Sequence, residues 1–367
     1  MTRSLRDYNY VLIGCVIVLT GFSLAMVYSA TLNVPDTHGY FGRHLGNLGV
    51  ATLAMLLFTI LDYHALEAWA IPLFGLMVVA LAVVLVLGKI SSGAQSWLAF
   101  GFRNFQPSEA AKIIVMVALA ALWSRFERAT GTWRLFLGSL ALVGVPTGLI
   151  FIQPDFGTAM VLGVMWLAMA WAAGSTLAQM TALFVAGIPS GFVGWSYVLA
   201  KYQKDRLLIF IDPLKYDPEL KHGAWNILQS LRAISSGGAT GRGWTHGVMA
   251  QANTLPVQYT DFIFAITAEE LGFIGTALML VFQGLLIWQA FSIAATARDT
   301  FGRLLAVGIG AIFLCHLLVN AGMNMSIMPI TGIPLPFISY GGSFTLTSFV
   351  AVGLLQSVSL RHRRITF

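Results

Sequence analysis

Long apolar runs, separated by short polar stretches, dominate this chain of 367 residues. An apolar run of about twenty residues is the length that crosses a bilayer as a helix. The pattern therefore predicts ten membrane-spanning helices, at about 10–31, 43–61, 68–88, 108–125, 135–152, 156–173, 177–199, 273–295, 303–322 and 343–360. The first run follows Arg3 and Arg6 and precedes no clear cleavage site, so we expect it to be retained.

The composition excludes a water-soluble globule. Hydrophobic residues make up 57% of the chain and charged residues only 10%, with a mean hydropathy of +0.79, whereas about a quarter of the residues of a soluble domain are charged. The expected fold class is all-α, in the form of a polytopic integral membrane protein with about ten transmembrane helices. No composition shift divides the chain, so residues 1–367 are expected to form a single membrane domain.

The distribution of cations predicts the orientation. With an even number of spans both termini lie on one side, and the positive-inside bias makes that side cytoplasmic. The cations there are Arg3, Arg6, Arg125, Arg128, Arg134, Arg298, Arg303, Arg361, Arg363 and Arg364. We therefore expect a multi-pass protein of a cytoplasmic membrane, whose net charge of +6 reflects topology rather than nucleic-acid binding.

Three segments on the opposite side are unusually polar: 89–107, the long extracytoplasmic loop at about 200–260, and 323–342. Irregular backbone at membrane depth is tolerated only where protein or a water-filled cavity satisfies its polar groups. The prolines and glycines of the third segment also forbid a continuous helix. We therefore expect broken or re-entrant elements on the outer face.

Asp261 is the first candidate for chemistry. It follows the long loop and opens the run 261–272, which leads into the apolar span that begins at about 273, and Glu269 and Glu270 come about two helical turns later. A carboxylate at a membrane boundary costs a few kcal/mol unless it is paired or solvated. Such a cost favours a functional role.

Glu109 and Lys112 open the fourth span three residues apart, so they face each other on one helical turn. The pattern fits an interfacial salt bridge as well as a contact with a substrate. Arg103, just upstream, fits an interfacial anchor equally well.

Three further segments carry polar candidates. Asp155, in a tight Pro-Asp-Phe-Gly turn, is typical of a helix cap but could also bind a substrate. Arg242 lies in a glycine-rich stretch that could form a backbone nest for phosphate, although it is not a P-loop. Ser339 and Gly341 end the proline-rich segment.

Together these motifs resemble the SEDS family of bacterial shape, elongation, division and sporulation proteins, in order and over nearly the whole chain. Segment 329–336 is most similar to the rod-shape elongation branch. Where many members have a glutamate and a histidine shortly before the aspartate, this chain has Val257 and Tyr259. The motifs are QSWL at 95–98, QPSEAAK at 106–112, QPDFGT at 153–158, ISSGG at 234–238, GRG at 241–243, TDFIF at 260–264, EELG at 269–272 and PLPFISYGGS at 334–343.

The resemblance implies a peptidoglycan glycosyltransferase that polymerises lipid II into β-1,4-linked glycan strands at the outer face of the bacterial cytoplasmic (inner) membrane during elongation. Asp261 is then the expected general base of an inverting transfer. A divalent cation, Mg²⁺ or Mn²⁺, is a possible cofactor with unknown ligands, and no organic cofactor is expected. The residues expected to bind substrate are Arg103, Glu109, Lys112, Asp155, Arg242, Ser339 and Gly341.

The resemblance also implies a partner, a class B penicillin-binding protein with transpeptidase activity, besides lipid II and membrane lipid. Two other functions stay open: a lipid II flippase, and a non-catalytic scaffold for the transpeptidase. Transport needs polar sites near the midplane that are reachable from both sides, whereas these candidates lie toward one face. Small residues of the ninth span and of the start of the eighth suggest a docking face for the partner's helix: Gly302, Ala306, Gly308, Gly310, Ala311, Gly275 and Ala277.

Overall fold

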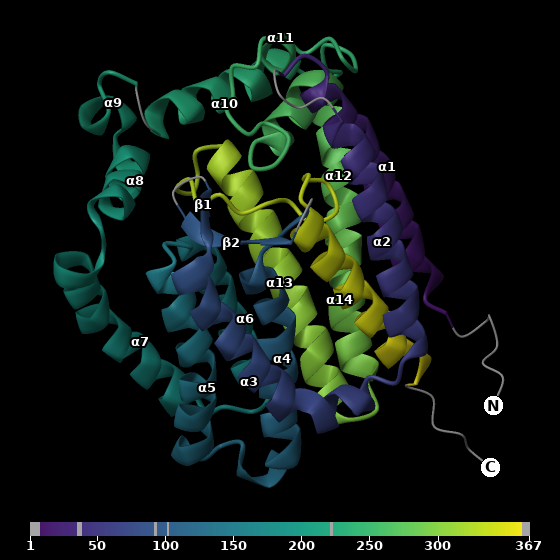
Figure 1. Cartoon of the computed structure of the whole chain (residues 1–367), viewed down its shortest axis with the longest axis vertical. Coiled ribbons are helices and arrows are strands. Elements are labelled where there is room, and N and C mark those ends of the chain that lie inside the picture. The colour runs from purple at the N-terminus through teal and green to yellow at the C-terminus, as the bar shows by residue number, and fades with distance from the viewer. Residues whose placement is uncertain (1–7, 35–38, 92–93, 101–102, 221–222, 362–367) are drawn as a thin grey trace.

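The computed structural model describes residues 8–34, 39–91, 94–100, 103–220 and 223–361. Ten apolar helices in this part of the chain run between the two ends of the molecule (Figure 1). They are α1 (Tyr10–Thr31), α2 (Tyr40–Ile60), α3 (His64–Leu87), α4 (Pro107–Arg125), α5 (Trp133–Ile152), α6 (Phe156–Ala172), α7 (Leu177–Val193), α12 (Ile263–Thr296), α13 (Thr300–Asn324) and α14 (Gly342–Leu360). Among the described helices, nine are long and apolar enough to cross a membrane, with α7 counted together with the π-helical turn that follows it (Leu177–Tyr197, 21 residues), and α6 is shorter at 17 residues.

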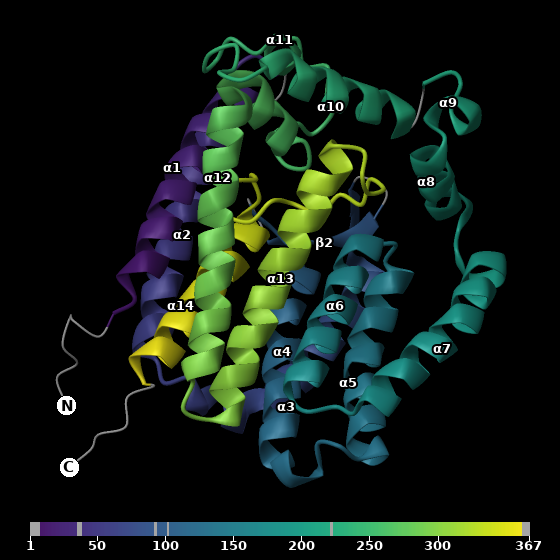
Figure 2. The same ribbon diagram turned by 180° about the vertical axis from the view of Figure 1, so that it is seen from behind.

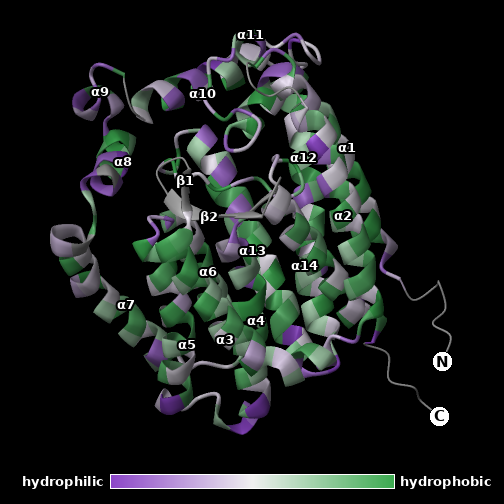
Figure 3. Cartoon of the chain, in the orientation of Figure 1, coloured by the Kyte–Doolittle hydropathy of each residue, from purple (hydrophilic) through white to green (hydrophobic). Residues whose placement is uncertain are grey.

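The molecule has two distinct ends. At the terminal end α1 begins, α14 ends and the short loops 61–63 and 297–299 turn. At the opposite end, here called the site end, lie the longer connections, including α10 (Gly223–Gly237) and α11 (Val248–Gln251) (Figures 1 and 2). Hydrophilic residues gather at both ends and apolar residues along the helices between them (Figure 3). This distribution is that of a multi-pass membrane protein.

The centre of the bundle is formed by α4, α13 and α14, whose most apolar stretches are 72%, 78% and 78% buried. α13 packs against α4, α6, α12 and α14. α7, by contrast, is only 11% buried and lies along one side of the molecule (Figures 1 and 2). The central helices therefore carry the site, and the peripheral ones present apolar side chains outward.

The predicted spans agree with these helices to within a few residues, except at α12. This helix begins at Ile263, ten residues before the predicted start, and is interrupted at Gly272, where φ is 66° and ψ is −167°. The predicted start at 273 thus coincides with the break. A short helical stretch that contains Glu269 and Glu270 precedes it.

The polar segments contain structure that hydropathy did not predict. A π-helical turn η3 (Gly194–Val198) lies at the end of the seventh predicted span, and the long loop holds α8 (Lys201–Ile211), α9 (Pro213–Tyr216), α10 and α11. Residues 89–105 form a small antiparallel sheet of β1 (Lys89–Ser91), β2 (Ala94–Phe100) and β3 (Arg103–Phe105), in that order. A 3-10 turn, η2 (Glu127–Ala129), joins α4 to α5. The described residues are thus predominantly helical, with one small sheet of three strands that was not expected.

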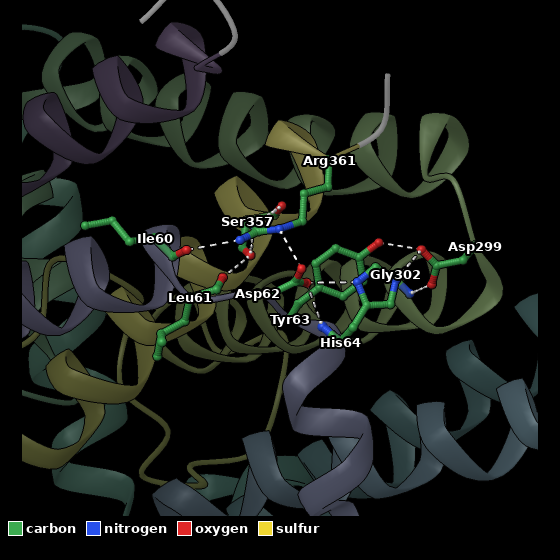
Figure 4. A network of polar contacts seen from close by, with 9 residues as sticks. All are labelled: Ile60, Leu61, Asp62, Tyr63, His64, Asp299, Gly302, Ser357 and Arg361. Carbon is green, nitrogen blue, oxygen red and sulfur yellow. Dashed lines mark hydrogen bonds and ion pairs between the residues drawn. The ribbon is translucent and has the colours of Figure 1, made fainter. Parts of the chain in front are cut away.

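A polar network closes the terminal end (Figure 4). Asp62 accepts from His64 Nδ1 at 2.8 Å and lies 3.3 Å from Arg361 Nε. Asp299 caps α13 by accepting from the Gly302 amide at 2.8 Å. Burial alone would raise the pKa of Asp62, but His64 and Arg361 outweigh it and lower the pKa below its ordinary value.

The predicted docking face on the ninth span is wrong. A side-chain carbon on Gly308 would lie 2.6 Å from Met116 Sδ, and one on Gly310 would lie 3.0 Å from the Phe291 ring. Gly302, Ala306 and Ala311 are also buried. Small residues in α13 therefore serve close packing inside this chain, and they offer no surface to a partner's helix.

Candidate active site

The backbone of Asp261 is fixed from two sides. Its carbonyl oxygen accepts from Asn320 Nδ2 and from Asn324 Nδ2, each at 3.0 Å. Its amide donates to the carbonyl of Val257 at 3.3 Å, which closes a tight turn. Asp261 therefore has a defined position just before α12.

The two asparagines belong to a polar stripe on α13. His316, Asn320 and Asn324 recur every four residues, so they lie on one helical face, and all three are buried. Asn320 Nδ2 also donates to the carbonyl of Ile333 at 2.7 Å. Sequence reasoning missed this stripe, although its four-residue spacing is visible in the sequence.

The proline-rich segment 329–341 lies between α13 and the turn that carries Asp261. Ser339 Oγ accepts from the Leu335 amide at 2.8 Å and donates to the carbonyl of Thr260 at 2.7 Å. The Tyr340 amide donates to the carbonyl of Tyr259 at 2.9 Å. The expected broken element thus exists, and side chains and neighbouring backbone satisfy its polar groups as membrane depth requires.

Ser339 and Gly341 are placed differently from the expectation of direct substrate binding. The Ser339 hydroxyl is buried and already bonded to two backbone groups. Gly341 precedes α14 with an extended φ of 165°. In this structure Ser339 positions the turn of residues 259–261, and substrate contact by either residue stays a prediction.

Gly332 lies directly beside the carboxylate of Asp261. Its φ is +72°, and a side-chain carbon there would lie 3.4 Å from Asp261 Oδ2. Only glycine takes this backbone conformation at no steric cost. The Asp261 carboxylate therefore lies directly over the glycine.

Glu109 and Lys112 form the pair that their spacing predicts. Lys112 Nζ lies 2.9 Å from Glu109, and both side chains are buried. Nζ also lies 3.1 Å from His316 Nε2, while His316 Nδ1 lies 2.9 Å from the carbonyl of Pro334. Because that carbonyl can only accept, Nδ1 donates to it and Nε2 accepts from the lysine ammonium.

In this structure Glu109 and Lys112 have the contacts of a buried salt bridge. Lys112 is 3% exposed and its ammonium is engaged by Glu109 and His316. The cavity beside it, of about 10 Å³, holds no more than a water molecule. The pair therefore links α4 to α13 and to Pro334, and contact of Lys112 with a substrate stays a prediction.

Asp155 acts as the helix cap that its turn suggested. Its Oδ1 accepts from the Thr158 amide at 3.1 Å, and its Oδ2 accepts from Gln106 Nε2 at 3.2 Å and from Ser108 Oγ at 3.3 Å. Two residues later, Gly157 lets α6 approach segment 331–333: a side-chain carbon there would lie 3.1 Å from the carbonyl of Thr331. Asp155 thus holds the start of α6 beside the start of α4, and Gly157 places α6 against the proline-rich segment.

The glycine-rich stretch has a structural role that the sequence did not reveal. The break at Gly272 leaves backbone groups of α12 without helical partners, and residues 238–243 supply them. The amides of Arg242 and Gly243 donate to the carbonyls of Glu269 and Glu270, each at 3.0 Å. The amide of Phe273 donates to the carbonyl of Gly238 at 2.9 Å.

This contact is too close for side chains. A carbon added at Gly241 would lie 2.1 Å from the carbonyl oxygen of Glu270, and one at Gly272 would lie 2.2 Å from the Gly241 amide nitrogen. The glycines therefore allow two backbones to dock. A phosphate nest is not needed to explain them.

Glu269 and Glu270 are buried, and each is bonded to backbone amides. Glu269 accepts from the amides of Met249 at 2.8 Å and Ala250 at 3.1 Å. Glu270 accepts from Ser29 Oγ and from the Thr245 amide. These carboxylates anchor the long loop and α1 to the start of α12, which leaves Asp261 as the carboxylate best placed for chemistry.

The two predicted arginines differ in what the structure says of them. Arg242 is exposed, and its Nε donates to the carbonyl of Ser236 at 3.2 Å. Arg103 lies in β3, paired with Phe100, and its side chain lies outside the described residues. Arg206 of α8, which sequence reasoning did not single out, is close enough to act on Asp261 by its charge.

The surroundings of Asp261 tune its basicity. Burial raises the pKa of Asp261 to about 6, although the Thr260 hydroxyl and the charge of Arg206 act in the opposite direction. A carboxylate with such a pKa is still ionised at neutral pH and is a stronger base than an ordinary one. Asp261 can therefore accept a proton under physiological conditions.

Among the described residues, no three His, Cys, Asp or Glu side chains come together as a metal cage. Mg²⁺ is commonly held by one or two carboxylates together with substrate phosphates and waters. Because a general base has to keep its carboxylate free to take a proton, Asp261 is not assigned as a ligand of such a cation. A divalent cation stays a prediction.

The fold and site define a multi-pass membrane protein with a partly buried aspartate of raised pKa at one end. The family model described as "Cell cycle protein", which covers FtsW, RodA and SpoVE, matches residues 9–364. The chain therefore belongs to the FtsW, RodA and SpoVE family. This confirms the family that the motifs predicted.

Relatives with curated names agree. The peptidoglycan glycosyltransferase MrdB of Escherichia coli (strain K12) is 34% identical over 352 residues, which cover 95% of this chain and 92% of that protein. The peptidoglycan glycosyltransferase RodA of Treponema pallidum is 31% identical, over 98% of this chain and 99% of that protein. The similarity thus covers the whole membrane domain of both.

Two solved structures share the fold. A chain from a peptidoglycan synthase complex, described as coordinating polymerization and crosslinking, matches with a TM-score of 0.82 at 28% identity, over 96% of this chain and 97% of that one. The rod shape determining protein RodA of Thermus thermophilus matches with a TM-score of 0.70 at 25% identity, over 96% of each chain. The helical membrane fold is therefore shared.

Proposed function

We propose that this chain is a peptidoglycan glycosyltransferase that polymerises lipid II, with Asp261 as its general base. The relatives named above carry this activity in their names. The assignment of the base rests on the position and the pKa of Asp261. Its backbone carbonyl accepts from Asn320 and Asn324, and burial raises the pKa of its carboxyl group to about 6.

Each bond that forms in the glycosyl transfer is matched by one that breaks. The carboxylate of Asp261 takes the proton of a sugar 4-hydroxyl, whose oxygen attacks C1 of a polyprenyl-pyrophosphoryl sugar. The new C1–O bond forms as the bond from C1 to the pyrophosphate oxygen breaks, and polyprenyl pyrophosphate leaves with the electron pair. Attack from the opposite face inverts C1, so an α linkage becomes β-1,4.

The leaving pyrophosphate needs positive charge rather than a general acid. Arg242 is exposed, and Arg206 acts on Asp261 by its charge. Lys112 is a weaker candidate because its ammonium is buried and engaged. A divalent cation would add positive charge at the leaving pyrophosphate, where Mg²⁺ is commonly held largely by phosphate oxygens and waters.

The orientation and the partner belong to the same proposal. The cations of the terminal end, such as Arg125, Arg128 and Arg298, favour a cytoplasmic location for both termini in the bacterial inner membrane. Asp261 would then face outward, where a crosslinking transpeptidase works. The similarity to a chain of a peptidoglycan synthase complex supports such a partner, a class B penicillin-binding protein.

The test uses purified protein and lipid II, with glycan strands separated on a gel. Asp261→Asn keeps the shape of the side chain but removes the base, and we expect turnover to fall by roughly 10² or more. Asp212→Asn, which changes an exposed carboxylate in the long loop, should leave turnover unchanged. Near-normal polymerisation by Asp261→Asn would exclude Asp261 as the base and favour a scaffold role.

The pH dependence provides a second readout. Because the base must be deprotonated, kcat/KM should rise about tenfold per pH unit below pH 6 and level off above it. Initial rates between pH 5 and pH 8 measure this profile. A flat profile over that range would contradict the assignment.

A further inference from the structure

Three tyrosines from distant parts of the chain meet beside Asp261. The rings of Tyr40 and Tyr340 are stacked, with centroids 5.2 Å apart and planes at 13°. Tyr259 meets both edge-on, at 5.4 Å from Tyr40 and 5.7 Å from Tyr340. We call these three residues the tyrosine cluster.

The cluster is tied to the turn that carries Asp261. Tyr259 lies two residues before Asp261, and its carbonyl accepts from the Tyr340 amide at 2.9 Å. The charge of Asp261 is near enough to affect Tyr259. Tyr259 therefore lies near the carboxylate, and Tyr40 and Tyr340 pack against Tyr259.

Packing alone does not explain the cluster. All three tyrosines are only partly buried, unlike the core aromatic residues Trp123, Phe301 and Phe349. Arg43, which is exposed, lies with its guanidinium 5.6 Å from the centre of the Tyr40 ring. Partly exposed aromatic rings, phenol hydroxyls and a cation are thus gathered at the edge of the candidate active site.

Tyr259 keeps its proton throughout the physiological range. Burial, then the neighbouring Tyr40 and Tyr340 and the charge of Asp261, raise the pKa of Tyr259 to about 12. Its hydroxyl is bonded to Tyr40 and remains both a donor and an acceptor. A neutral polar ligand could exchange hydrogen bonds with it at any working pH.

This combination suits a sugar. A pyranose presents C–H groups on its face, which are attracted to the negative face of an aromatic ring, and hydroxyls at its rim, which bond to phenols. The sugar nearest to a general base is the one whose hydroxyl the base deprotonates, because proton transfer requires hydrogen-bond distance. The cluster therefore adjoins the acceptor sugar rather than the donor.

We infer that Tyr40, Tyr259 and Tyr340 form the binding platform for the acceptor saccharide, the sugar whose 4-hydroxyl attacks. That this sugar is the acceptor rests on the proposed function. Binding of a saccharide to the three tyrosines can be measured without turnover. Arg43 borders the platform and provides positive charge for an acidic group carried by the same substrate.

The first experiment measures binding to full-length protein in detergent, with the soluble disaccharide of N-acetylglucosamine and N-acetylmuramic acid as the probe. Saturation-transfer NMR should show contacts to the disaccharide in the wild type and in Asp261→Asn. The contacts should disappear in Tyr40→Ala and Tyr259→Ala. Tyr28→Ala, at the same end but in a cluster with Phe41 and Trp244, is the matched control and should keep them.

The second experiment separates KM from kcat with lipid II as substrate. Tyr40→Ala and Tyr259→Ala should raise KM about three- to tenfold with a smaller change in kcat, while Tyr259→Phe, which keeps the ring, should lie in between. Thermal unfolding checks that each variant is folded. Loss of contacts and the rise in KM together support the platform.

Two results would overturn the inference: disaccharide contacts unchanged in the folded tyrosine variants, or no contacts in a wild type that polymerises lipid II. In both cases the proposed function would stand on the Asp261 variants. Conversely, tyrosine-dependent contacts in a protein that makes no polymer would support a saccharide platform while removing the proposed activity.

Discussion

The carboxylates at the two ends of the bundle have different surroundings. At the terminal end Asp62 and Asp299 are surrounded by donors, with His64, Tyr63 and Arg361 beside them (Figure 4). At the site end the backbone of Asp261 is bonded, while burial dominates the surroundings of its carboxylate. The partners of Asp62 lower its pKa and stabilise its charged form, whereas burial raises the pKa of Asp261 and makes it a stronger base.

The largest effect should come from the backbone docking that supports the site end. Gly241→Ala would force a carbon to 2.1 Å from the carbonyl of Glu270, so we expect a loss of about 3 kcal/mol or more in the free energy of unfolding. Gly238→Ala is the matched control, because Gly238 also has a positive φ but nothing lies within 4 Å. It should cost about 1–2 kcal/mol. Thermal unfolding in detergent compares them, and equal losses would mean that the close contact contributes nothing.

The buried pair of Glu109 and Lys112 should come next. Lys112→Met leaves the Glu109 carboxylate buried without its ammonium, which costs about 3–5 kcal/mol where a pair is truly buried. Adding Glu109→Gln should restore part of the stability. A double-mutant cycle measures the coupling. Additive losses would show that the two side chains do not interact, and unchanged stability with lost turnover would instead assign Lys112 to the substrate.

The two ends should respond to pH with opposite sign. Because the folded pKa of Asp261 is raised to about 6, its contribution to stability is present below pH 3.8 and is lost as the pH rises through 6. Asp261→Asn should therefore stabilise the fold at pH 8, by up to about 3 kcal/mol, and have little effect near pH 4. Unfolding temperatures at both pH values test this. A variant that is less stable than the wild type at pH 8 would contradict the raised pKa.

Asp62 should give the smallest effect. Its folded pKa is lowered, so its contribution is present above pH 3.8 and is lost as the pH falls below that value. The side chain is half exposed, so Asp62→Asn should cost less than about 1 kcal/mol at neutral pH and progressively less as the pH falls below 3.8. The same unfolding scans measure it. Stabilisation at neutral pH would remove the contrast between the ends.

Much of the membrane fold could be predicted because hydropathy is a local property. The predicted spans match α1, α4, α5 and α14 to within two residues at each end. The sheet of residues 89–105 and the helices of the long loop were missed because their segments have no long apolar run. The family prediction is confirmed, and the predicted activity agrees with the names of the relatives.

The site was only partly predictable, because partners distant in sequence decide what a side chain does. The spacing of Glu109 and Lys112 gave their pairing, but nothing local indicated that His316, 204 residues away, completes it. Gly241 suggested a phosphate nest, whereas its partner is the backbone at Glu270. The small residues of α13 suggested a partner's helix, although this chain's own Met116 and Phe291 cover them.

The bonds that fix the turn of Asp261 have a consequence for binding. Asn320 and Asn324 hold its carbonyl, and Ser339 holds the preceding one. Fixing the backbone of one residue costs about 1–2 kcal/mol of conformational entropy, and here that cost is met during folding. The turn is preorganised, so a substrate does not have to order it, and more of the interaction free energy remains available to favour the transition state.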